Sequence, residues 1–312
     1  MKIYNSIEEF SPDFKVVLTI GTFDGVHIGH QSIIKALNDR AKRMGSQSVL
    51  LTFYPHPTHV LFPNDERLKL ITTIEERSKL LYEYGLNHLI VQEFTSEFSR
   101  ITSVNFVRDI LVGKLRLSKL IIGYDHHFGR NREGNFEELL SLSKLYNYDI
   151  EKIDPHKHNN ISVSSSKIRK LVSNAQMEKA KDYLGRYFTI KGEVIKGKSI
   201  GATLGYPTAN LRIQNSWKLI PQDGVYAVLV YVQQKEYLGM MNIGSNPTFD
   251  INDRTIEVHI LDFNQNIYGE ELVVAFIKKI RDEKKFGSLE DLKKRIQIDE
   301  NRIRLFSNAM TK

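Results

Sequence analysis

The stretch that decides the fold is FKVVLTIGTFDGVHIGHQ, residues 14–31. Its first part, residues 14–21, is a short apolar and β-branched run that ends in glycine, which predicts a buried strand. Residues 31–45 then have the apolar spacing of a helix. The segment GTFDGVHIGHQ is therefore expected to be a strand-to-helix turn. Its glycines would let the backbone pass close to a ligand; they are Gly21, Gly25 and Gly29.

Two histidines stand where this helix is expected to begin. A helix N-terminus already favours anions, and the imidazoles of His27 and His30 could donate hydrogen bonds to phosphate oxygens. A turn with incidental histidines is the alternative. The position at the first strand-to-helix turn of an α/β domain favours the phosphate site.

Strand-like and helix-like segments alternate through the first half of the chain. This alternation predicts a parallel sheet covered by helices, with ligands bound at the carboxyl ends of the strands. The further strands are expected at 47–53, 87–94 and 118–123, and the further helices at 72–85, 103–115 and 135–147.

The rhythm changes near residue 185. Short strands broken by Gly, Pro, Asn and Asp follow, which predicts a small antiparallel barrel, and a helix is expected at 288–307. The barrel strands are expected at 224–232, 237–243, 255–261 and 271–280. Two short helices before Gly185 join the halves, so we expect domains at 1–184 and 185–312.

Composition excludes several classes of protein. The 312 residues include no cysteine, which excludes disulfides, thiolate zinc sites and cysteine nucleophiles. The net charge of +7 is spread evenly and forms no basic block, which favours a solvated surface over a nucleic-acid interface. No apolar run is long enough to span a membrane and the N-terminus lacks a signal-peptide core, so a cytoplasmic protein is expected.

A serine cluster precedes the first linking helix. VSSSKIR (163–169) could hold phosphate through hydroxyls and backbone N–H groups, with Lys167 and Arg169 adding positive charge. A simple serine N-cap fits the same residues. The serines are Ser164, Ser165 and Ser166.

The second half has its own candidate site. KGKSIGATLGYPTANL (196–211) is glycine-rich, as in loops that wrap phosphates, although the glycines alone also fit a hairpin. Thr208 and Asn210 face the same way on an extended chain and offer oxygen ligands that suit Mg²⁺. Glu257 and His259 share one face of the expected strand 255–261, where an ordinary outward-facing glutamate is the alternative.

These motifs carry a family resemblance over nearly the whole chain. The H-x-G-H turn and the serine segment resemble the nucleotidylyltransferase superfamily. LTFYPHP (51–57), IGYDHHFGRNREG (122–134), GYPTANL (205–211) and IRDEKKF (280–286) resemble the bacterial riboflavin kinase/FAD synthetase family more narrowly. The resemblance implies a Rossmann-like first domain and two reactions, phosphorylation of riboflavin to FMN and adenylylation of FMN to FAD, with ATP and Mg²⁺.

The resemblance also implies roles for single residues. In the first half, His27, His30, the serines and Arg169 would stabilise ATP phosphates, and Asp125 and Phe128 would contact flavin or adenosine. In the second half, Glu257 would be the general base, and Thr208 and Asn210 would bind Mg²⁺. Further ATP contacts would come from Gly21, Phe23, Gly29, Gly197, Gly201, Gly205 and Pro207, and flavin contacts from Arg281, Glu283 and Phe286.

Two positions depart from the family pattern. Ala202 stands where the family often has Arg, so Lys196 or Lys198 would have to supply that contact. His126 stands where the family more often has Phe.

A different nucleotidylyltransferase with an unrelated C-terminal module is one alternative function, but it would leave the P-T-A-N and E-V-H-I motifs unexplained. A non-enzymatic RNA-binding protein would need clustered basic charge. Small molecules are the expected partners, with no nucleic acid and no membrane; the sequence gives no indication of the oligomeric state.

Overall fold

The computed structural model describes residues 1–124, 127–130, 133–154, 157–158, 161–197, 200–245 and 254–310. The chain divides into two compact units, Met1–Ser165 and Ser166–Lys312. Among the described helices, none is both long and apolar enough to cross a lipid bilayer.

The first unit is built on a six-stranded sheet in which every pair of neighbours is parallel. The order is β1-β4-β3-β2-β5-β6, so β3 and β5 flank β2 on opposite sides and the order reverses there. The carboxyl end of β2 therefore opens on the crevice where parallel α/β sheets bind ligands. The strands are β1 (Lys2–Tyr4), β2 (Val16–Ile20), β3 (Gln47–Tyr54), β4 (His88–Glu93), β5 (Leu117–Gly123) and β6 (Asp149–Ile153).

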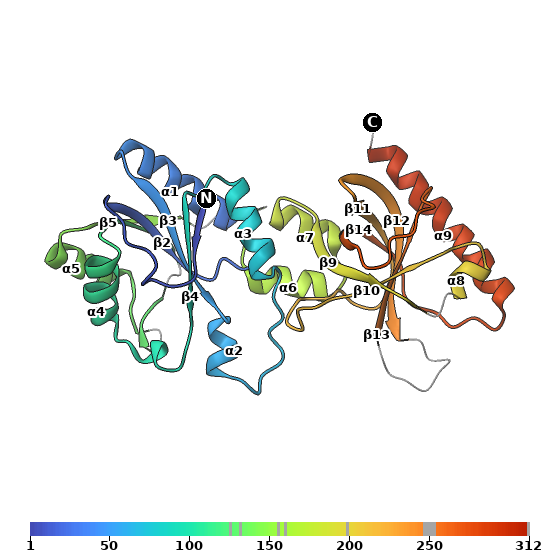
Figure 1. The fold of residues 1–312 in the computed structure, drawn as a ribbon, viewed down its shortest axis with the longest axis horizontal. Coiled ribbons are helices and arrows are strands. Elements are labelled where there is room, and N and C mark those ends of the chain that lie inside the picture. Colours follow the sequence, from blue (N-terminus) through green and yellow to red (C-terminus); the bar gives the residue numbers. More distant parts are fainter. Residues whose placement is uncertain are drawn as a thin grey trace. The chain divides into compact units, whose positions relative to one another are not determined.

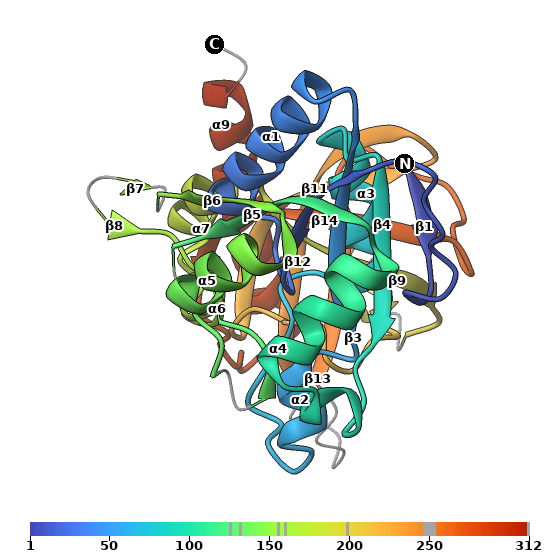
Figure 2. The ribbon, with the colours of Figure 1, turned by 90° about the vertical axis from the view of Figure 1, so that its left-hand side faces the viewer.

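Helices cover both faces of this sheet (Figures 1 and 2). Alternate residues of β2 point to opposite faces: Leu18 packs in a core with the helical segments η2 and α5, whereas Val17 packs in a second core with α1 and α3. The helical segments are α1 (Ile28–Arg43), α2 (Pro57–Leu61), α3 (Ile74–Glu83), η1 (Phe98–Arg100), α4 (Ser103–Asn105), the π-helical η2 (Phe106–Lys114) and α5 (Phe136–Tyr146). The predicted α/β architecture is confirmed.

Several short elements of this unit were not predicted. They are the edge strands β1 and β6, the one-turn helix α2, and a small hairpin of β7 (Lys157–His158) and β8 (Ile161–Ser162). The expected helix at 72–85 is shorter, because Thr73 and Glu76 form a capping box that starts α3 at Ile74. The expected helix at 31–45 instead begins at Ile28, where the His27 side chain caps it.

The second unit contains a closed antiparallel barrel of order β10-β13-β12-β11-β14-β9. The expected strands are confirmed, and β9 and β10 complete the barrel. Two helices lead into it, α6 (Ser165–Ser173) and α7 (Met177–Leu184), and α8 (Ile200–Thr203) is a single turn. The barrel strands are β9 (Phe188–Ile195), β10 (Ala209–Arg212), β11 (Gly224–Val232), β12 (Lys235–Ser245), β13 (Arg254–Ile260) and β14 (Glu271–Arg281).

The C-terminal helix α9 (Leu289–Met310) lies against the outside of this barrel (Figure 1). Ile303 of α9 shares a core cluster with Val225, Met240 and Ile277 of the barrel. Ser288 caps the helix, since its hydroxyl accepts from the backbone N–H of Asp291 at 3.1 Å. The covered barrel face carries alternate residues of each strand.

Candidate active sites

The turn between β2 and α1 is held in an unusual backbone conformation. Four of its residues have positive φ: Gly21 at 158°, Phe23 at 48°, Gly25 at 85° and Val26 at 37°. Phe23 and Val26 are not glycines, so their conformation costs free energy that other contacts of the turn must offset. A Cβ on Gly25 would lie 3.0 Å from the side chain of Ile71, so the turn also passes close to its neighbour.

The two histidines of the turn stack on each other. Their ring centroids are 3.6 Å apart with planes 16° from parallel, and Phe23 packs on His30 at 4.5 Å. His27 Nδ1 accepts a hydrogen bond from the backbone N–H of His30 at 3.2 Å. The neutral His27 ring therefore carries its proton on Nε2, which can act as a donor beside the helix N-terminus. The structure thus places both predicted histidines, with Gly29 between them, at the start of α1.

A fully buried carboxylate anchors this turn. The oxygens of Asp24 accept hydrogen bonds from the backbone N–H groups of Ile71 and Thr72, each at 3.0 Å, and from the Thr72 hydroxyl at 3.1 Å. Arg77, also buried, lies 3.6 Å from Asp24 as its ion-pair partner. The Thr72 hydroxyl accepts from the Gly25 N–H at 2.9 Å, so it ties a second residue of the turn. Asp24 is part of the quoted motif, but sequence reasoning assigned it no role.

The serine segment meets the same turn. The Ser165 hydroxyl donates to the backbone carbonyl of Asp24 at 2.9 Å, within the first unit. Ser165 is the first residue of α6, and Ser166 and Arg169 follow on that helix, while Ser164 lies just before it. The hydroxyl of Ser165 thus fixes the turn, while its backbone N–H belongs to the first turn of the helix.

Phe128, a predicted flavin or adenosine contact, follows β5 in the chain. Phe128 is a core residue, 6.1 Å from Phe106 between ring centroids, and a Cβ on Gly134 would lie 2.4 Å from its ring. His56 caps α2 by accepting from the Thr58 N–H at 3.2 Å. Asp125, His126 and Lys198 lie outside the described residues.

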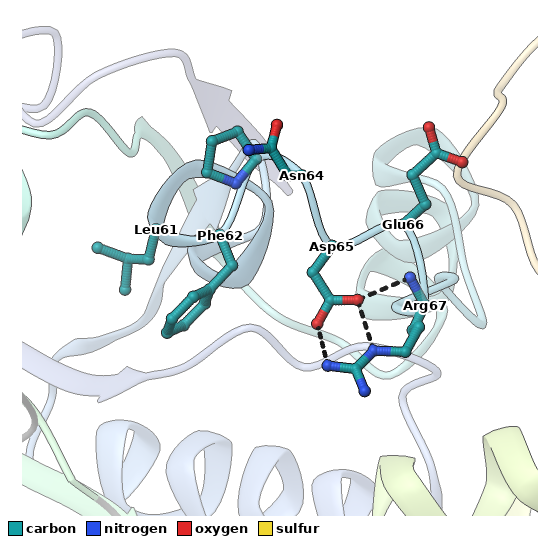
Figure 3. Close-up of a pocket in the computed structure, with 7 residues that line it drawn as sticks. Leu61, Phe62, Asn64, Asp65, Glu66 and Arg67 are labelled. Atoms are coloured by element: carbon teal, nitrogen blue, oxygen red, sulfur yellow. Dashed lines mark hydrogen bonds and ion pairs between the residues drawn. The ribbon is translucent and has the colours of Figure 1, made fainter.

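An open pocket follows α2 (Figure 3). Arg67 donates to Asp65 through Nε and Nη2, both at 2.8 Å, and these bonds lower the pKa of the Asp65 carboxyl to about 2. The pocket encloses about 870 Å³ and is lined by Leu61, Phe62, Pro63, Asn64, Asp65, Glu66 and Arg67. None of these residues is a sequence candidate.

In the barrel, Glu257 lies half-buried between two asparagines. It pairs in register with Asn210 of β10 on one side and with Asn242 of β12 on the other. The Thr208 hydroxyl donates to Glu257 Oε2 at 3.3 Å. Directly paired residues point to the same face of a sheet, so the three predicted residues are brought together with Asn242, which sequence reasoning missed.

This pairing extends into a row across five strands. Asn242 pairs with Val225 of β11, and Val225 pairs with Arg281 of β14. Val225 belongs to the core cluster beneath α9, so the row is on the outer face of the barrel, the face against which α9 packs. Glu257 and Arg281 are three strand spacings apart along the row, about 14 Å along the sheet. Candidate site residues that are far apart in the sequence therefore lie in one row across the barrel.

Each glycine of the predicted phosphate loop has a steric reason. A Cβ on Gly197 would lie 1.9 Å from the Asn210 side-chain nitrogen, and one on Gly201 would lie 2.3 Å from the Tyr206 carbonyl oxygen. Gly205 has φ of +87°. The loop therefore packs tightly against Tyr206 and the P-T-A-N segment, and its residues 200–203 form the single turn α8.

His259 and Tyr206 support this segment from the side of α9. His259 Nδ1 lies 2.7 Å from the carbonyl oxygen of Pro207, which identifies Nδ1 as the protonated nitrogen that donates. The Tyr206 ring packs edge-on to His259 at 5.2 Å, and its hydroxyl donates to Glu300 of α9 at 3.2 Å. Burial and then the hydrogen bond to Glu300 raise the pKa of Tyr206.

The predicted flavin segment begins at the end of β14. Arg281 Nε donates to Asp299 of α9 at 2.6 Å, and the Arg281 guanidinium lies over the Phe286 ring at 5.6 Å. A Cβ on Gly244 would lie 2.0 Å from the Glu283 carboxylate, so this carboxylate rests against the backbone of β12. Asp299 is a second fully buried aspartate that sequence reasoning missed. Helical spacing could have identified Asp299, because positions 296, 299 and 303 share one face of a helix. That face of α9 is apolar and carries Ile296 and Ile303.

Comparison with known proteins identifies two family segments. The FAD synthetase family profile matches residues 10–167, and the riboflavin kinase profile matches residues 184–306. A bifunctional riboflavin kinase/FMN adenylyltransferase from Listeria monocytogenes is 36% identical over 295 residues, covering 94% of this chain and 93% of the relative. The protein of the same name from Escherichia coli K12 is 35% identical over 309 residues and 98% of both chains.

A solved structure shares the fold over nearly the whole chain. It is described as a macrolide-efflux protein from Streptococcus pneumoniae and superposes with a TM-score of 0.88 at 30% identity, covering 97% of this chain and 98% of that one.

Proposed function

This chain belongs to the family of bifunctional riboflavin kinases/FMN adenylyltransferases, and we propose that residues 1–184 carry the adenylyltransferase and residues 185–312 the kinase. The enzyme uses ATP to phosphorylate riboflavin to FMN and transfers AMP from ATP to FMN, giving FAD and pyrophosphate. The alternative of an unrelated C-terminal module is not favoured, because the riboflavin kinase profile matches residues 184–306.

In the adenylyl transfer, an FMN phosphate oxygen attacks the α-phosphorus of ATP in line. The bond from that phosphorus to the bridging oxygen breaks, and pyrophosphate leaves. No enzyme nucleophile is required, so catalysis is positioning plus stabilisation of charge on phosphate oxygens. His27 Nε2, His30 and the N-terminus of α1 supply donors for this charge, and Asp24 holds the turn that carries them. Gly21 and Phe23 shape the turn by their positive φ, and Gly29 lies in the first turn of α1. The serines and Arg169 offer further donors.

In the kinase step, Glu257 accepts the proton of the ribityl 5′-hydroxyl as its oxygen attacks the γ-phosphorus of ATP. An alcohol is a poor nucleophile, and general base catalysis of this kind typically contributes about 10²–10⁴-fold. The observation that carries this assignment is the row in which Glu257 lies beside Asn210 and in reach of the Thr208 hydroxyl. The same row ends at Arg281, which with Glu283 and Phe286 would hold the flavin ring. Gly197, Gly201, Gly205 and Pro207 would let the loop approach the phosphates.

The barrel residues fit Mg²⁺ by their donor chemistry. The Thr208 hydroxyl directs its proton to Glu257, which leaves its lone pairs for a cation, and Asn210 adds an amide oxygen. The described residues form no group of three or more His, Cys, Asp or Glu side chains that could hold a metal. A bound Mg²⁺ would therefore take Thr208 and Asn210 with waters and phosphates, and it would neutralise charge on the ATP phosphates.

The remaining roles follow from the two reactions. Asp125 and Phe128 remain proposed flavin or adenosine contacts. ATP, riboflavin and FMN are the small-molecule partners, and we place the enzyme in the cytoplasm, where ATP is available, with no nucleic acid or membrane partner.

Incubation of the purified chain with riboflavin, ATP and Mg²⁺ tests this function directly. Chromatography should show FMN first and FAD later, each dependent on ATP. A fragment of residues 185–312 should make FMN but no FAD. A fragment that folds and binds riboflavin and ATP, yet makes no FMN, would count against the boundary or the assignment.

A further inference from the structure

The buried carboxylate of Asp299 lies between two arginines. Asp299 is fully buried on the barrel-facing side of α9. Its Oδ2 accepts from Arg281 Nε at 2.6 Å, and its Oδ1 lies 3.2 Å from Arg295 Nε, one helical turn earlier. A buried carboxylate is costly unless it is paired, so its neighbours must compensate it. The pair with Arg281 joins α9 to the end of β14.

This contact fixes the Arg281 guanidinium from one edge, through its Nε. Nε donates to Asp299, Nη1 donates to the Asp282 carbonyl at 3.0 Å, and the plane lies over the Phe286 ring. Nη2 makes no hydrogen bond to any residue that the structure describes. The guanidinium has five N–H donors in a rigid fork, so fixing two nitrogens also fixes the direction of the third.

We propose that Asp299 is a positioning residue for riboflavin binding, which acts by holding Arg281 so that Nη2 points at the flavin ring. The inference rests on the proposed flavin role of Arg281. Arg281 ends the row that begins at Asn210 and Glu257, so its direction sets where the flavin lies relative to the base. Pre-ordering Arg281 in the free enzyme removes the cost of ordering a long side chain upon binding.

Asp299→Asn in the full-length chain tests the proposal. The amide keeps the size of the carboxylate but loses the charge that holds Arg281. Loss of a charge-assisted hydrogen bond should raise the riboflavin KM roughly 10-fold or more, while kcat for FMN formation changes by less than about threefold. The ATP KM and FAD formation from added FMN should stay at wild-type values. An unchanged riboflavin KM in a folded variant overturns the proposal.

Arg295→Gln is the matched control. It removes the second guanidinium, whose Nε lies 3.2 Å from the same carboxylate, and leaves the hydrogen bond between Arg281 and Asp299 in place. The proposal expects the riboflavin KM of this variant to stay within about twofold of wild type. If Asp299→Asn and Arg295→Gln raise the riboflavin KM equally, Asp299 merely stabilises α9 and the proposal fails.

Arg281→Ala separates this inference from the proposed flavin role. If it leaves the riboflavin KM unchanged, the flavin role of Arg281 fails. If it raises the KM but Asp299→Asn does not, the flavin role stands and Asp299 is not the positioning residue. In the Arg281→Ala background, Asp299→Asn should raise the KM no further, because its effect passes through Arg281.

A measurement on the wild-type chain covers the case in which Asp299→Asn does not fold. The Nε–H of Arg281, identified by its loss in Arg281→Lys, should exchange with solvent much more slowly than that of the exposed Arg212, before and after riboflavin is added. Exchange as fast as that of Arg212 in the riboflavin complex would overturn the proposal.

Discussion

The two candidate sites are assembled from opposite kinds of sequence. In the first unit, the histidines, glycines and anchoring aspartate lie within one run of ten residues, 21–30. In the barrel, Asn210, Glu257, Asn242 and Arg281 come from four strands and meet only because the pairing register aligns them. Local backbone conformation therefore sets the first site, and strand register sets the second.

Both sites have a fully buried aspartate in contact with residues that we propose to bind the ligands. Asp24 accepts hydrogen bonds from two backbone N–H groups of another loop and thereby holds a turn. Asp299 holds side chains, two guanidiniums. A substitution at Asp24 should therefore disturb a whole loop, whereas one at Asp299 should disturb a single contact with the substrate.

Glu257→Gln should have the largest effect of any single substitution at the two sites. It keeps the shape of the side chain but removes the proton acceptor, so FMN formation should fall about 10²–10⁴-fold while riboflavin and ATP still bind. FAD formation from added FMN should continue. Initial rates of both products measure this.

The matched control is Glu271→Gln on β14, whose carboxylate forms an exposed ion pair with Lys191. It should leave both rates near wild type, since exposed pairs contribute little. Near-normal riboflavin phosphorylation by Glu257→Gln would remove the base assignment.

His30→Ala should lower FAD formation by about 10²–10³-fold, because one donor to developing phosphate charge is lost. FMN formation by the same chain serves as the internal control. Equal loss of both activities would indicate misfolding and leave no support for the role of His30.

The sequence predicted the first site better than the second, for a physical reason. A strand, a glycine turn and a helix start are local, so His27 and His30 could be placed from GTFDGVHIGH alone. The partners of Asp24 could not be predicted, because Thr72 lies in a distant loop and Arg77 lies on α3. In the barrel, Glu257 and Asn210 were found as motifs, but Asn242 and Asp299 have no motif and required the register and the packing of α9.

Asp24→Asn should destabilise the first unit. It leaves Arg77 buried without its ion partner, which typically costs about 3–5 kcal/mol. FAD formation should fall with stability, and urea unfolding measures the change. Asp65→Asn is the control, because its partner Arg67 is exposed, so its effect on the free energy of unfolding should be small. Equal effects of the two variants would contradict the anchoring role of Asp24.

Tyr206→Phe should have the smallest effect. It removes one hydrogen bond to Glu300 near the surface, which contributes below about 1 kcal/mol. The pKa of Tyr206 is raised in the folded state. The protonated hydroxyl therefore stabilises the fold below the unfolded-state pKa of about 10, and this stabilisation is lost as the pH rises above that value. Urea unfolding at pH 7.5 and at higher pH should show the wild-type advantage shrinking above about pH 10. An advantage that grew with pH would contradict the sign of the shift.

Mixing two full-length variants tests most directly whether residues 1–184 and residues 185–312 divide the two reactions between them. With riboflavin, ATP and Mg²⁺, His30→Ala alone should accumulate FMN and form FAD only very slowly, and Glu257→Gln alone should form very little of either product. The mixture should make FAD, because one chain supplies FMN and the other adenylylates it. A mixture in which His30→Ala releases FMN but no FAD forms, although Glu257→Gln is folded, would contradict the division of labour.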